Sequence, residues 1–378
     1  MTMHLSLILA AALTYVLATW IFFYKIRLQL KTVSDGFILY TISTSLVFGL
    51  IFLIIWLAGI KGPYVFLLAA YIWSMIWGWL GVYFLLRKKV CAFGIASDSL
   101  DDDLRLVTGV QVRPISGCST PNDVHALFVN LNAISQPTTR TVLVECGEMG
   151  VPIYHVRLAY EILLGKVPLK YLSPKLVPLM SPPFRYMSLK RALDIFLVLF
   201  SVPLILPLVL VVSVLVKLDS PGPIFFTQER VGKDGRLFTI IKFRTMRVDA
   251  EKHGAQFAAS EDARVTRVGR WLRKFRIDEI PQFWNVLKGD MSLIGPRPEQ
   301  AVFVERFKKE IPFYDYRHLV RPGITGWAQV MQGYAASEEE TKEKLEYDLY
   351  YVKNLSFWLD YAIFLKTIKT IFTGFGAR

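Results

Sequence analysis

Cysteine is scarce in this chain, and its few copies form no recognisable pattern. Only three are present, Cys91, Cys118 and Cys146, and each stands alone. A disulfide framework needs paired cysteines, and a structural zinc site needs closely spaced cysteine or histidine ligands. The sequence therefore excludes both, and it favours buried free thiols in a reducing compartment.

Acidic residues are outnumbered by basic ones. The 378 residues include 31 Asp and Glu against 44 Lys and Arg, which gives a formal net charge of +13. Hydrophobic residues nevertheless make up 53% of the chain, and the mean hydropathy is +0.38. This combination is typical of a membrane protein with a cationic cytoplasmic face, or of a protein that handles anionic substrates. Nucleic acid is not expected as a partner, because no arginine-rich tail, zinc-finger spacing or recognition-helix pattern is present.

Charge is nearly absent from three long apolar runs, at His4–Tyr24, Phe37–Ile60 and Tyr64–Leu86. Each run is long enough to cross a hydrocarbon core about 30 Å thick as a helix. The first has no basic segment before it and no cleavage site, so we interpret it as a retained span. We predict three transmembrane helices in residues 1–89 and a lipid bilayer as a partner. Basic clusters follow the first and third runs. The positive-inside rule therefore places the N-terminus outside and the chain after the third run in the cytoplasm.

Residues 90–183 alternate short apolar runs with amphipathic ones, which predicts a small α/β domain and a linker. Strands are expected at Lys89–Phe93 and Thr141–Cys146, and helices at Pro121–Ile134 and Ile153–Leu164. After the first strand the chain has one glycine where a dinucleotide fingerprint has three. The domain is therefore interpreted as degenerate Rossmann-like, a structural or regulatory spacer with no bound nucleotide.

A fourth apolar run, Ile195–Val216, is again about the length of a membrane span. On length alone a fourth crossing is open, but it would move the basic region that follows to the far side of the membrane. Pro203 and Pro207 lie inside the run, where each removes a backbone hydrogen bond and bends a helix. We therefore predict a re-entrant helix that enters one leaflet and returns, with Ser201 bonding a carbonyl that the kink frees. Basic residues flank both ends, among them Lys190, Arg191, Arg230, Lys233 and Arg236.

An acidic pair, Asp278 and Glu279, stands just before Pro281. Proline is favoured at the first position of a helix, so the pair is expected at a helix N-terminus, where the dipole stabilises negative charge. Arg273 and Arg276 lie close by in the sequence. In isolation such a pair is most often a helix-terminus charge, but carboxylates among cations also suit a magnesium-assisted phosphoryl site.

Several further motifs follow one another in the second half of the chain. They are Ser220–Gly232, Lys242–Met246, Arg273–Trp284, Gly289–Pro298, Arg321–Trp327 and Tyr347–Tyr351. Together they resemble the monotopic phosphoglycosyl transferases, the bacterial polyprenyl-phosphate sugar-1-phosphate transferases, in the long form with N-terminal spans. The resemblance covers about Ser188 to Phe372, half of the chain.

The resemblance implies a reaction, a fold and a location. The family transfers a sugar-1-phosphate from a nucleotide diphosphosugar to polyprenyl (undecaprenyl) phosphate and releases UMP, the first membrane step of exopolysaccharide, capsule or O-antigen synthesis. Residues 184–378 would form a mostly helical α+β catalytic domain on the cytoplasmic face of the bacterial inner membrane. Partners would be a UDP-hexose, polyprenyl phosphate and the bilayer, with a homo-oligomer and downstream glycosyltransferases as further candidates.

The resemblance also assigns residues. Asp278 would be the nucleophile that carries the phosphosugar and a Mg²⁺ ligand, and Glu279 would place the metal or accept a proton. The substrate and phosphate-binding set would be Lys242, Arg244, Arg273, Arg297 and Asp348.

Two features depart from the long members of the family, which have about four N-terminal spans and a larger α/β domain. Here three spans and a shorter middle domain are predicted, so a regulatory role for residues 90–183 does not follow. The C-terminal run Asn354–Gly374 interleaves aromatic residues with lysines. That pattern suits an amphipathic helix in the lipid interface or a helix packed on the domain core.

Three other functions compete with a phosphoglycosyl transferase. A non-catalytic scaffold would have lost the acidic pair, which is intact here. A transporter would carry polar groups inside its membrane segments, and the first three runs hold essentially none. A conventional glycosyltransferase would release a nucleoside diphosphate, so a nucleoside monophosphate product separates it from the expected reaction.

Overall fold

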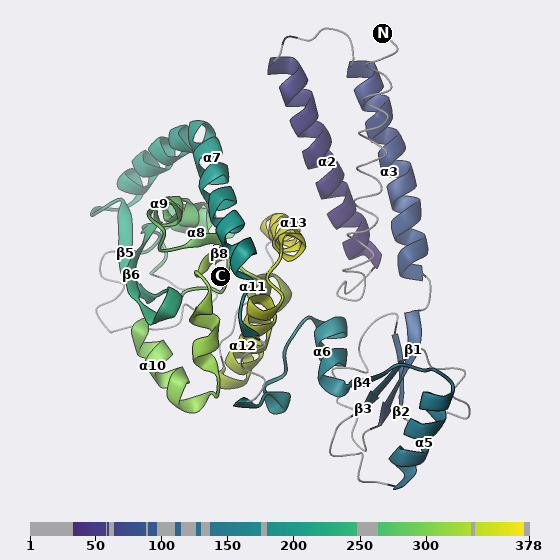
Figure 1. Ribbon diagram of the computed structural model, residues 1–378. Coiled ribbons are helices and arrows are strands. Elements are labelled where there is room, and N and C mark those ends of the chain that lie inside the picture. The colour runs from purple at the N-terminus through teal and green to yellow at the C-terminus, as the bar shows by residue number, and fades with distance from the viewer. Residues whose placement is uncertain are drawn as a thin grey trace. The chain divides into compact units, whose positions relative to one another are not determined.

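The computed structural model describes residues 33–57, 59, 64–87, 90–96, 110–114, 126–129, 137–174, 180–247, 264–333 and 337–373. The first predicted span, His4–Tyr24, lies outside the described residues. By internal contacts the chain divides into two compact units, Met1–Gly165 and Lys166–Arg378. Each is described by itself (Figure 1).

Two long helices form a hairpin in the first unit. Helix α2 (Val33–Leu57) packs beside α3 (Tyr64–Arg87), and both are long and apolar enough to cross a membrane. Tyr40 is fully buried between them, and its hydroxyl donates to the Ser74 carbonyl at 2.9 Å. The second and third predicted spans are therefore helices of the expected kind.

The rest of the first unit is a small α/β domain. Its four strands are β1 (Val90–Ala96), β2 (Val110–Pro114), β3 (Ala126–Val129) and β4 (Ile153–His155). They form a parallel sheet in the order β2-β1-β3-β4. Among the described residues, helices α5 (Pro137–Glu148) and α6 (Val156–Leu164) accompany the sheet.

Two of the predicted elements in this domain are wrong. Thr141–Cys146, expected as a strand, lies within α5, and the expected helix Pro121–Ile134 contains strand β3. The β-branched residues of α5 favour a strand locally. Burial follows helical spacing instead, since Cys146 and the partly buried Val142 and Leu143 pack on Leu127 and Val129 of β3.

The second unit is mostly helical, as expected for the catalytic domain. It also contains an antiparallel hairpin, β5 (Phe225–Val231) with β6 (Leu237–Phe243), and a short parallel pair, β7 (Ser292–Ile294) with β8 (Gly323–Thr325). The helices in its described residues are η5 (Leu169–Tyr171), α7 (Phe184–Asp219), η7 (Lys233–Gly235), α8 (Arg267–Lys274), η9 (Ile277–Gln282), α9 (Phe283–Lys288), α10 (Ala301–Glu310), η10 (Tyr314–Leu319), α11 (Trp327–Met331), α12 (Glu338–Lys353) and α13 (Phe357–Thr373).

Helix α7 is one bent helix of 36 residues with Pro203 and Pro207 inside it. A straight helix of this length would reach about 54 Å. Figure 1 shows that α7 turns sharply partway along instead. The prolines explain the bend, because each lacks a donor and its ring clashes with the preceding turn. The side chains near the bend are apolar and exposed, with Leu204 81% exposed and Phe200 65% exposed.

Both ends of α7 are attached to the same unit. Near its start, Asp194 accepts a hydrogen bond from the Ser292 hydroxyl at 2.7 Å. At its end, Asp219 accepts one from the backbone N–H of Val268 at 3.0 Å. The last turns also pack against the hairpin and α8 through Val212, Val216, Phe243 and Leu272.

Ser201 does not bond either carbonyl that the prolines leave without a donor. Its hydroxyl donates to the Val198 carbonyl at 2.7 Å. A proline deprives the carbonyl four residues earlier, which for Pro203 is that of Leu199. Ser201 therefore bonds the carbonyl one residue before the one that Pro203 frees, and the expected hydrogen bond to the freed carbonyl is not formed.

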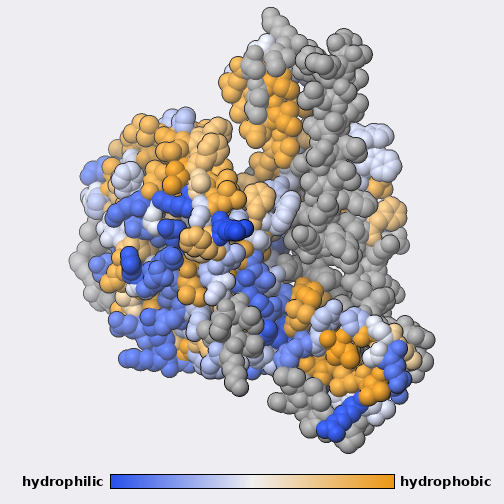
Figure 2. All heavy atoms as spheres, viewed as in Figure 1, coloured by the Kyte–Doolittle hydropathy of each residue, from blue (hydrophilic) through white to orange (hydrophobic). Residues whose placement is uncertain are grey.

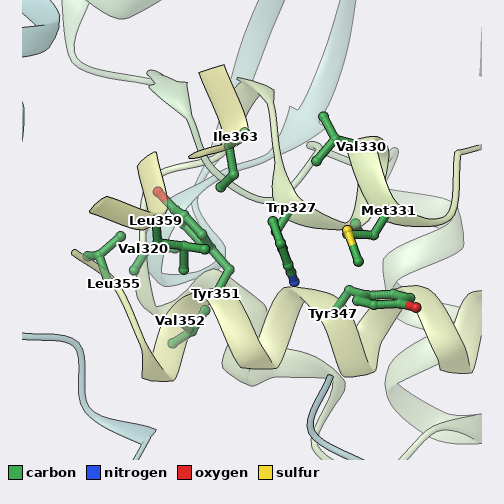
Figure 3. Close-up of a cluster of buried hydrophobic side chains, with 11 residues drawn as sticks. Val320, Trp327, Val330, Met331, Tyr347, Tyr351, Val352, Leu355, Leu359 and Ile363 are labelled. Atoms are coloured by element: carbon green, nitrogen blue, oxygen red, sulfur yellow. The ribbon is translucent and has the colours of Figure 1, made fainter. Parts of the chain in front are cut away.

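A large buried cluster centres on Trp327, which is 1% exposed and packs between α12 and α13 (Figure 3). Helix α13 contributes Leu359 and Ile363 to this core, whereas Phe357 and Phe364 are exposed. Core packing is thus confirmed for one face of α13. Figure 2 shows hydrophobic side chains gathered over α7 of this unit and hydrophilic ones over α10.

Candidate active site

The β5–β6 hairpin supplies Lys242. Residues Phe225 to Val231 pair in register with Phe243 to Leu237, so Lys242 sits one residue before the end of β6. Asn285 of α9, which sequence reasoning missed, is 1% exposed and bonds this strand at two points. Its amide donates to the Thr239 carbonyl at 2.7 Å and accepts from the Ile241 N–H at 3.1 Å. These two hydrogen bonds hold the start of α9, which directly follows the segment with the acidic pair, against β6.

Helix α8 supplies Arg273 and ends close to the acidic pair. A Cβ at Gly269 would collide with the Thr245 carbonyl, so glycine is needed where α8 meets the end of β6. Arg273 then donates from Nε to the Thr245 hydroxyl at 2.9 Å. The chain turns into η9 at Arg276, whose φ of 57° is left-handed. Such a conformation is unusual for arginine and typical of constrained functional sites.

Asp278 and Glu279 lie in the first turn of the 3₁₀-helix η9, as the motif predicts. Pro281, however, lies inside η9, and α9 begins only at Phe283. The expectation that Pro281 opens the helix is therefore wrong. Both carboxylates are buried, with Asp278 8% exposed and Glu279 5% exposed.

Glu279 is held by three cations. Its Oε1 lies 3.1 Å from Arg297 Nη2, 3.6 Å from Lys242 Nζ and 3.7 Å from Arg276 Nη1. Burial alone would raise the pKa of Glu279, but the positive charges of Arg297, Lys242 and Arg276 outweigh it and lower the pKa to about 2. Glu279 is therefore a permanent anion at the centre of a cationic cluster.

Asp278 has a different environment. Its Oδ1 is buried and accepts no hydrogen bond from any residue that the structure describes. Burial, and then the negative charge of Glu279, raise the pKa of Asp278 to about 6, against the opposing effect of Lys242, Arg276 and Arg273. Two adjacent carboxylates thus have opposite pKa shifts, a pattern that separates the roles of paired carboxylates in enzymes.

The Gly-Pro-Arg-Pro loop supplies Arg297. A Cβ on Gly323 would overlap the backbone N–H of Gly295, so two motifs far apart in sequence pack backbone against backbone. Gly295 N–H also donates to the Thr325 carbonyl at 2.8 Å, and Gly323 N–H to the Pro296 carbonyl at 2.9 Å. The loop is held closely enough to direct Arg297 at Glu279.

Asp348 lies in a separate buried cluster and not among the charges on the acidic pair. It is 1% exposed and forms an ion pair with Arg317 at 2.8 Å. Arg317 in turn donates to the Arg297 carbonyl at 2.9 Å and to the Tyr314 hydroxyl at 2.7 Å. Asp348 is therefore linked through Arg317 to the backbone of the Arg297 loop, and its place in the substrate-binding set stays a prediction. Sequence reasoning missed Arg317.

Arg244 is also placed away from the acidic pair. It is 6% exposed, and its guanidinium donates to the Ser220 carbonyl at 2.6 Å and the Pro221 carbonyl at 3.0 Å. These carbonyls lie just after α7. Arg244 therefore secures the end of α7, and its assignment to phosphate binding stays a prediction. Lys242, Arg273 and Arg297 do gather around the pair.

The site offers few ligands for a metal ion. Within the described residues, no group of three or more His, Cys, Asp or Glu side chains could hold one. The buried Asp278 Oδ1 without a donor is the one observation that fits a cation. Magnesium is commonly held by one or two carboxylates with substrate phosphates completing its shell, so these residues fit Mg²⁺ that arrives with a diphosphate.

A cavity of about 650 Å³ adjoins the acidic pair. Arg276, Glu279 and Ile280 line it where it meets η9. Its other walls come from the first half of α7, from α13 and from the β7–β8 pair, and they are mainly aliphatic and aromatic.

Taken together, the fold and the site define a membrane-associated, mostly helical protein with a buried carboxylate pair among lysine and arginine side chains. A model of the bacterial sugar transferase family matches residues 185–374, half of the chain. The chain belongs to this family, which confirms the predicted membership.

Relatives agree with the family. The chain is 55% identical over 236 residues to the UDP-N-acetylgalactosamine-undecaprenyl-phosphate N-acetylgalactosaminephosphotransferase of Aeromonas hydrophila, covering 62% of this chain and 56% of the relative. It is 41% identical over 203 residues to the UDP-glucose:undecaprenyl-phosphate glucose-1-phosphate transferase of Escherichia coli K12, covering 53% and 43%. The chain thus spans about half the length of these relatives.

Proposed function

We propose that this chain transfers a sugar-1-phosphate from a nucleotide diphosphosugar to polyprenyl phosphate, with Asp278 as the nucleophile. The observation that carries the proposal is the buried Asp278 Oδ1 without a donor in the described chain, beside a Glu279 held by three cations. Carboxylates are established nucleophiles for phosphoryl groups. The names of the relatives state the same class of reaction with undecaprenyl phosphate as acceptor.

The reaction then has two displacements. A carboxylate oxygen of Asp278 attacks the phosphorus that bears the sugar, and the bond from this phosphorus to the bridging oxygen breaks. UMP leaves with the bonding electrons, and an aspartyl phosphosugar remains. In the second displacement a phosphate oxygen of the acceptor attacks the same phosphorus, Asp278 leaves as a carboxylate, and polyprenyl diphosphosugar forms.

The cations around Glu279 serve the transferred phosphate. Charge in a phosphoryl transition state spreads over the equatorial oxygens, so positioned cations supply much of the stabilisation. Lys242, Arg276 and Arg297 are already gathered within 3.1 to 3.7 Å of Glu279 Oε1. Glu279 keeps this cluster assembled before the donor arrives, which accounts for its lowered pKa.

Magnesium is part of the proposal. Asp278, together with diphosphate oxygens, would hold Mg²⁺, and the ion would neutralise phosphate charge when bound. The chain's own part is to leave the Asp278 Oδ1 without a competing donor among the described residues, and Asp278 is ionised above about pH 6.

We propose UDP-N-acetylgalactosamine as the donor. The family resemblance implied a UDP-hexose. The relative named for N-acetylgalactosamine shares 55% identity, against 41% for the Escherichia coli relative named for glucose. The higher identity also extends over a longer part of the chain, 236 against 203 residues.

The proposed location is the cytoplasmic face of the bacterial inner membrane, with α7 as a re-entrant helix. Its exposed apolar bend suits a lipid environment, and Asp194 and Asp219 near its two ends bond the same unit. Because both ends of α7 are held by the same folded unit, a helix that enters the bilayer must return to the membrane face on which that unit lies.

Purified full chain, given UDP-N-acetylgalactosamine without acceptor, tests this function. We expect UMP in an amount equal to the enzyme and a gain of one N-acetylhexosamine phosphate in intact-protein mass, both lost in Asp278→Asn. A panel with UDP-N-acetylglucosamine, UDP-glucose and UDP-galactose ranks the donors. UDP as the product, or equal UMP release by Asp278→Asn, would overturn the mechanism.

A further inference from the structure

We propose that the cavity between α7 and α13 holds the first isoprene units of the acceptor lipid, so that the protein itself binds the tail next to the phosphate. This inference rests on the proposed function, because the acceptor is part of it. The cavity's volume of about 650 Å³ falls within the range of small-molecule sites, roughly 300 to 1,000 Å³.

The cavity reaches the residues on either side of the proposed nucleophile. Arg276 and Glu279 line it, and Glu279 follows Asp278 directly in the chain. The Arg276 side chain is 32% exposed and lies 3.7 Å from Glu279 Oε1. A phosphate placed beside Arg276 would therefore be near Asp278, and its hydrocarbon tail would extend into the rest of the cavity.

The walls beyond this point suit hydrocarbon. Helix α7 contributes Leu193 and Leu197, and α13 contributes Phe364. The two threonines that face each other satisfy one another, since Thr325 Oγ1 and Thr367 Oγ1 lie 2.8 Å apart. These hydroxyls therefore need no polar ligand, and the buried Oε1 of Gln329 is the lining oxygen that accepts no hydrogen bond from the described residues.

The charged residues of the lining are also compensated. Lys190 Nζ lies 2.8 Å from Asp360 Oδ2, which also accepts from the Tyr186 hydroxyl at 2.6 Å. Asp360 Oδ1 accepts from the Tyr351 hydroxyl at 2.8 Å. A nucleotide diphosphosugar would bring two phosphates and a polar base into this region, whereas an isoprenoid brings only apolar area, so the chemistry favours the acceptor's tail.

Position on α7 gives a matched pair of variants. Leu197 lines the cavity and is 49% exposed, whereas Leu199 is 55% exposed and is not part of the lining. Tryptophan at either place adds the same volume to the same half-exposed helix. Thr370→Trp, on the facing side of the cavity, is the second blocking variant.

Acceptor kinetics and photocrosslinking test the proposal. In full-length protein, Leu197→Trp and Thr370→Trp should raise KM for polyprenyl phosphate about tenfold, whereas Leu199→Trp should not. UMP release with donor alone should persist in all three. A prenyl phosphate with a photoreactive second isoprene unit should label peptides that contain Leu193, Leu197 or Phe364, and unlabelled polyprenyl phosphate should compete.

The outcomes separate the two proposals. Absence of donor-dependent UMP release in the unaltered chain would refute the proposed function. Intact UMP release with an unchanged acceptor KM in both blocking variants would refute only the cavity's role. Labelling by a photoreactive phospholipid that prenyl phosphate does not displace would likewise overturn it, because the cavity would then hold a membrane lipid.

Discussion

Replacing Glu279 by glutamine should lower the pH at which Asp278 becomes ionised. The pKa of Asp278 is raised to about 6, first by burial and second by the negative charge of Glu279. Glu279 has a pKa of about 2, so it is charged throughout the range from pH 5 to 8. The glutamine removes that charge and keeps nearly the same shape.

The size of the effect follows from these values. If the Asp278 carboxylate is the nucleophile, the donor half-reaction of the unaltered chain should slow about tenfold per pH unit well below pH 6. In Glu279→Gln the midpoint should move down from about 6 towards the ordinary value of 3.8, because the neighbouring negative charge is gone and the cations remain. The rate relative to its own plateau should therefore be up to about tenfold higher at pH 5. The plateau itself should fall, because Lys242, Arg276 and Arg297 lose the carboxylate that gathers them.

The assay is a single turnover of the donor with excess enzyme, quenched at intervals between pH 5 and 8 and analysed for UMP. Glu229→Gln, an exposed position on β5, is the matched control and should keep the midpoint near pH 6. Thermal melting of each protein separates loss of fold from loss of rate. A flat profile in the unaltered chain, or the same midpoint in Glu279→Gln, would refute the assignment of Asp278 and the coupling to Glu279.

Further changes should have distinct results. Asp278→Asn should abolish transfer yet raise the free energy of unfolding at pH 7 by about 1 to 3 kcal/mol. The folded-state pKa is raised to about 6, so ionised Asp278 costs stability above that pH. The gain in Asp278→Asn should therefore shrink below pH 4, and an equal gain at both pH values in denaturant titrations would contradict it. Asp348→Asn should leave the Arg317 charge buried without its partner and cost about 3 kcal/mol or more. It should also reduce UMP release, and unchanged melting would refute the pair's role. Single cysteines at Ser188 and Leu218, in an otherwise cysteine-free chain, should both resist an impermeant thiol reagent in intact spheroplasts and react after lysis. Labelling of the Leu218 site alone in intact cells would show that α7 crosses the membrane. Chelation with EDTA should stop UMP release and added Mg²⁺ should restore it, whereas full activity in EDTA would exclude the metal.

Local motifs predicted the centre of the site. The Asp278–Glu279 pair, Lys242 at the end of an alternating strand and Arg297 in a Gly-Pro-Arg-Pro loop are each visible in short stretches of sequence, and the structure brings them together. Such stretches carry their own turn and capping signals, so a single sequence is enough to recognise them.

Long-range partners could not be predicted in this way. Lys242 lies in β6 and Arg244 directly after it, only two residues apart, yet Arg244 secures the end of α7 and Lys242 reaches Glu279. Which of them faces the site depends on where α7 and α9 pack, and no local pattern specifies that. The same holds for Arg317, whose partners Asp348 and the Arg297 carbonyl lie 31 and 20 residues away in sequence.

In the middle domain, a local pattern predicted the wrong element, a strand where the structure has helix α5. Val142 and Val144 suggested a strand, because β-branched residues favour extended chain. The helix forms because one face of it packs on β3, and that tertiary gain exceeds a small difference in propensity.

The backbone contact between Gly295 and Gly323 has a consequence for how the protein is made. The acidic pair is synthesised before both glycines, but the loop that carries Arg297 has no fixed place until the chain around Gly323 docks beside it. The same loop is also held by the hydrogen bond from Arg317 to the Arg297 carbonyl. Arg317 is paired with Asp348, which is translated later still. Under the proposed function, a chain still on the ribosome therefore exposes Asp278 before the cationic cluster beside it is complete, and that cluster can form only after the segment that carries Asp348 has been translated.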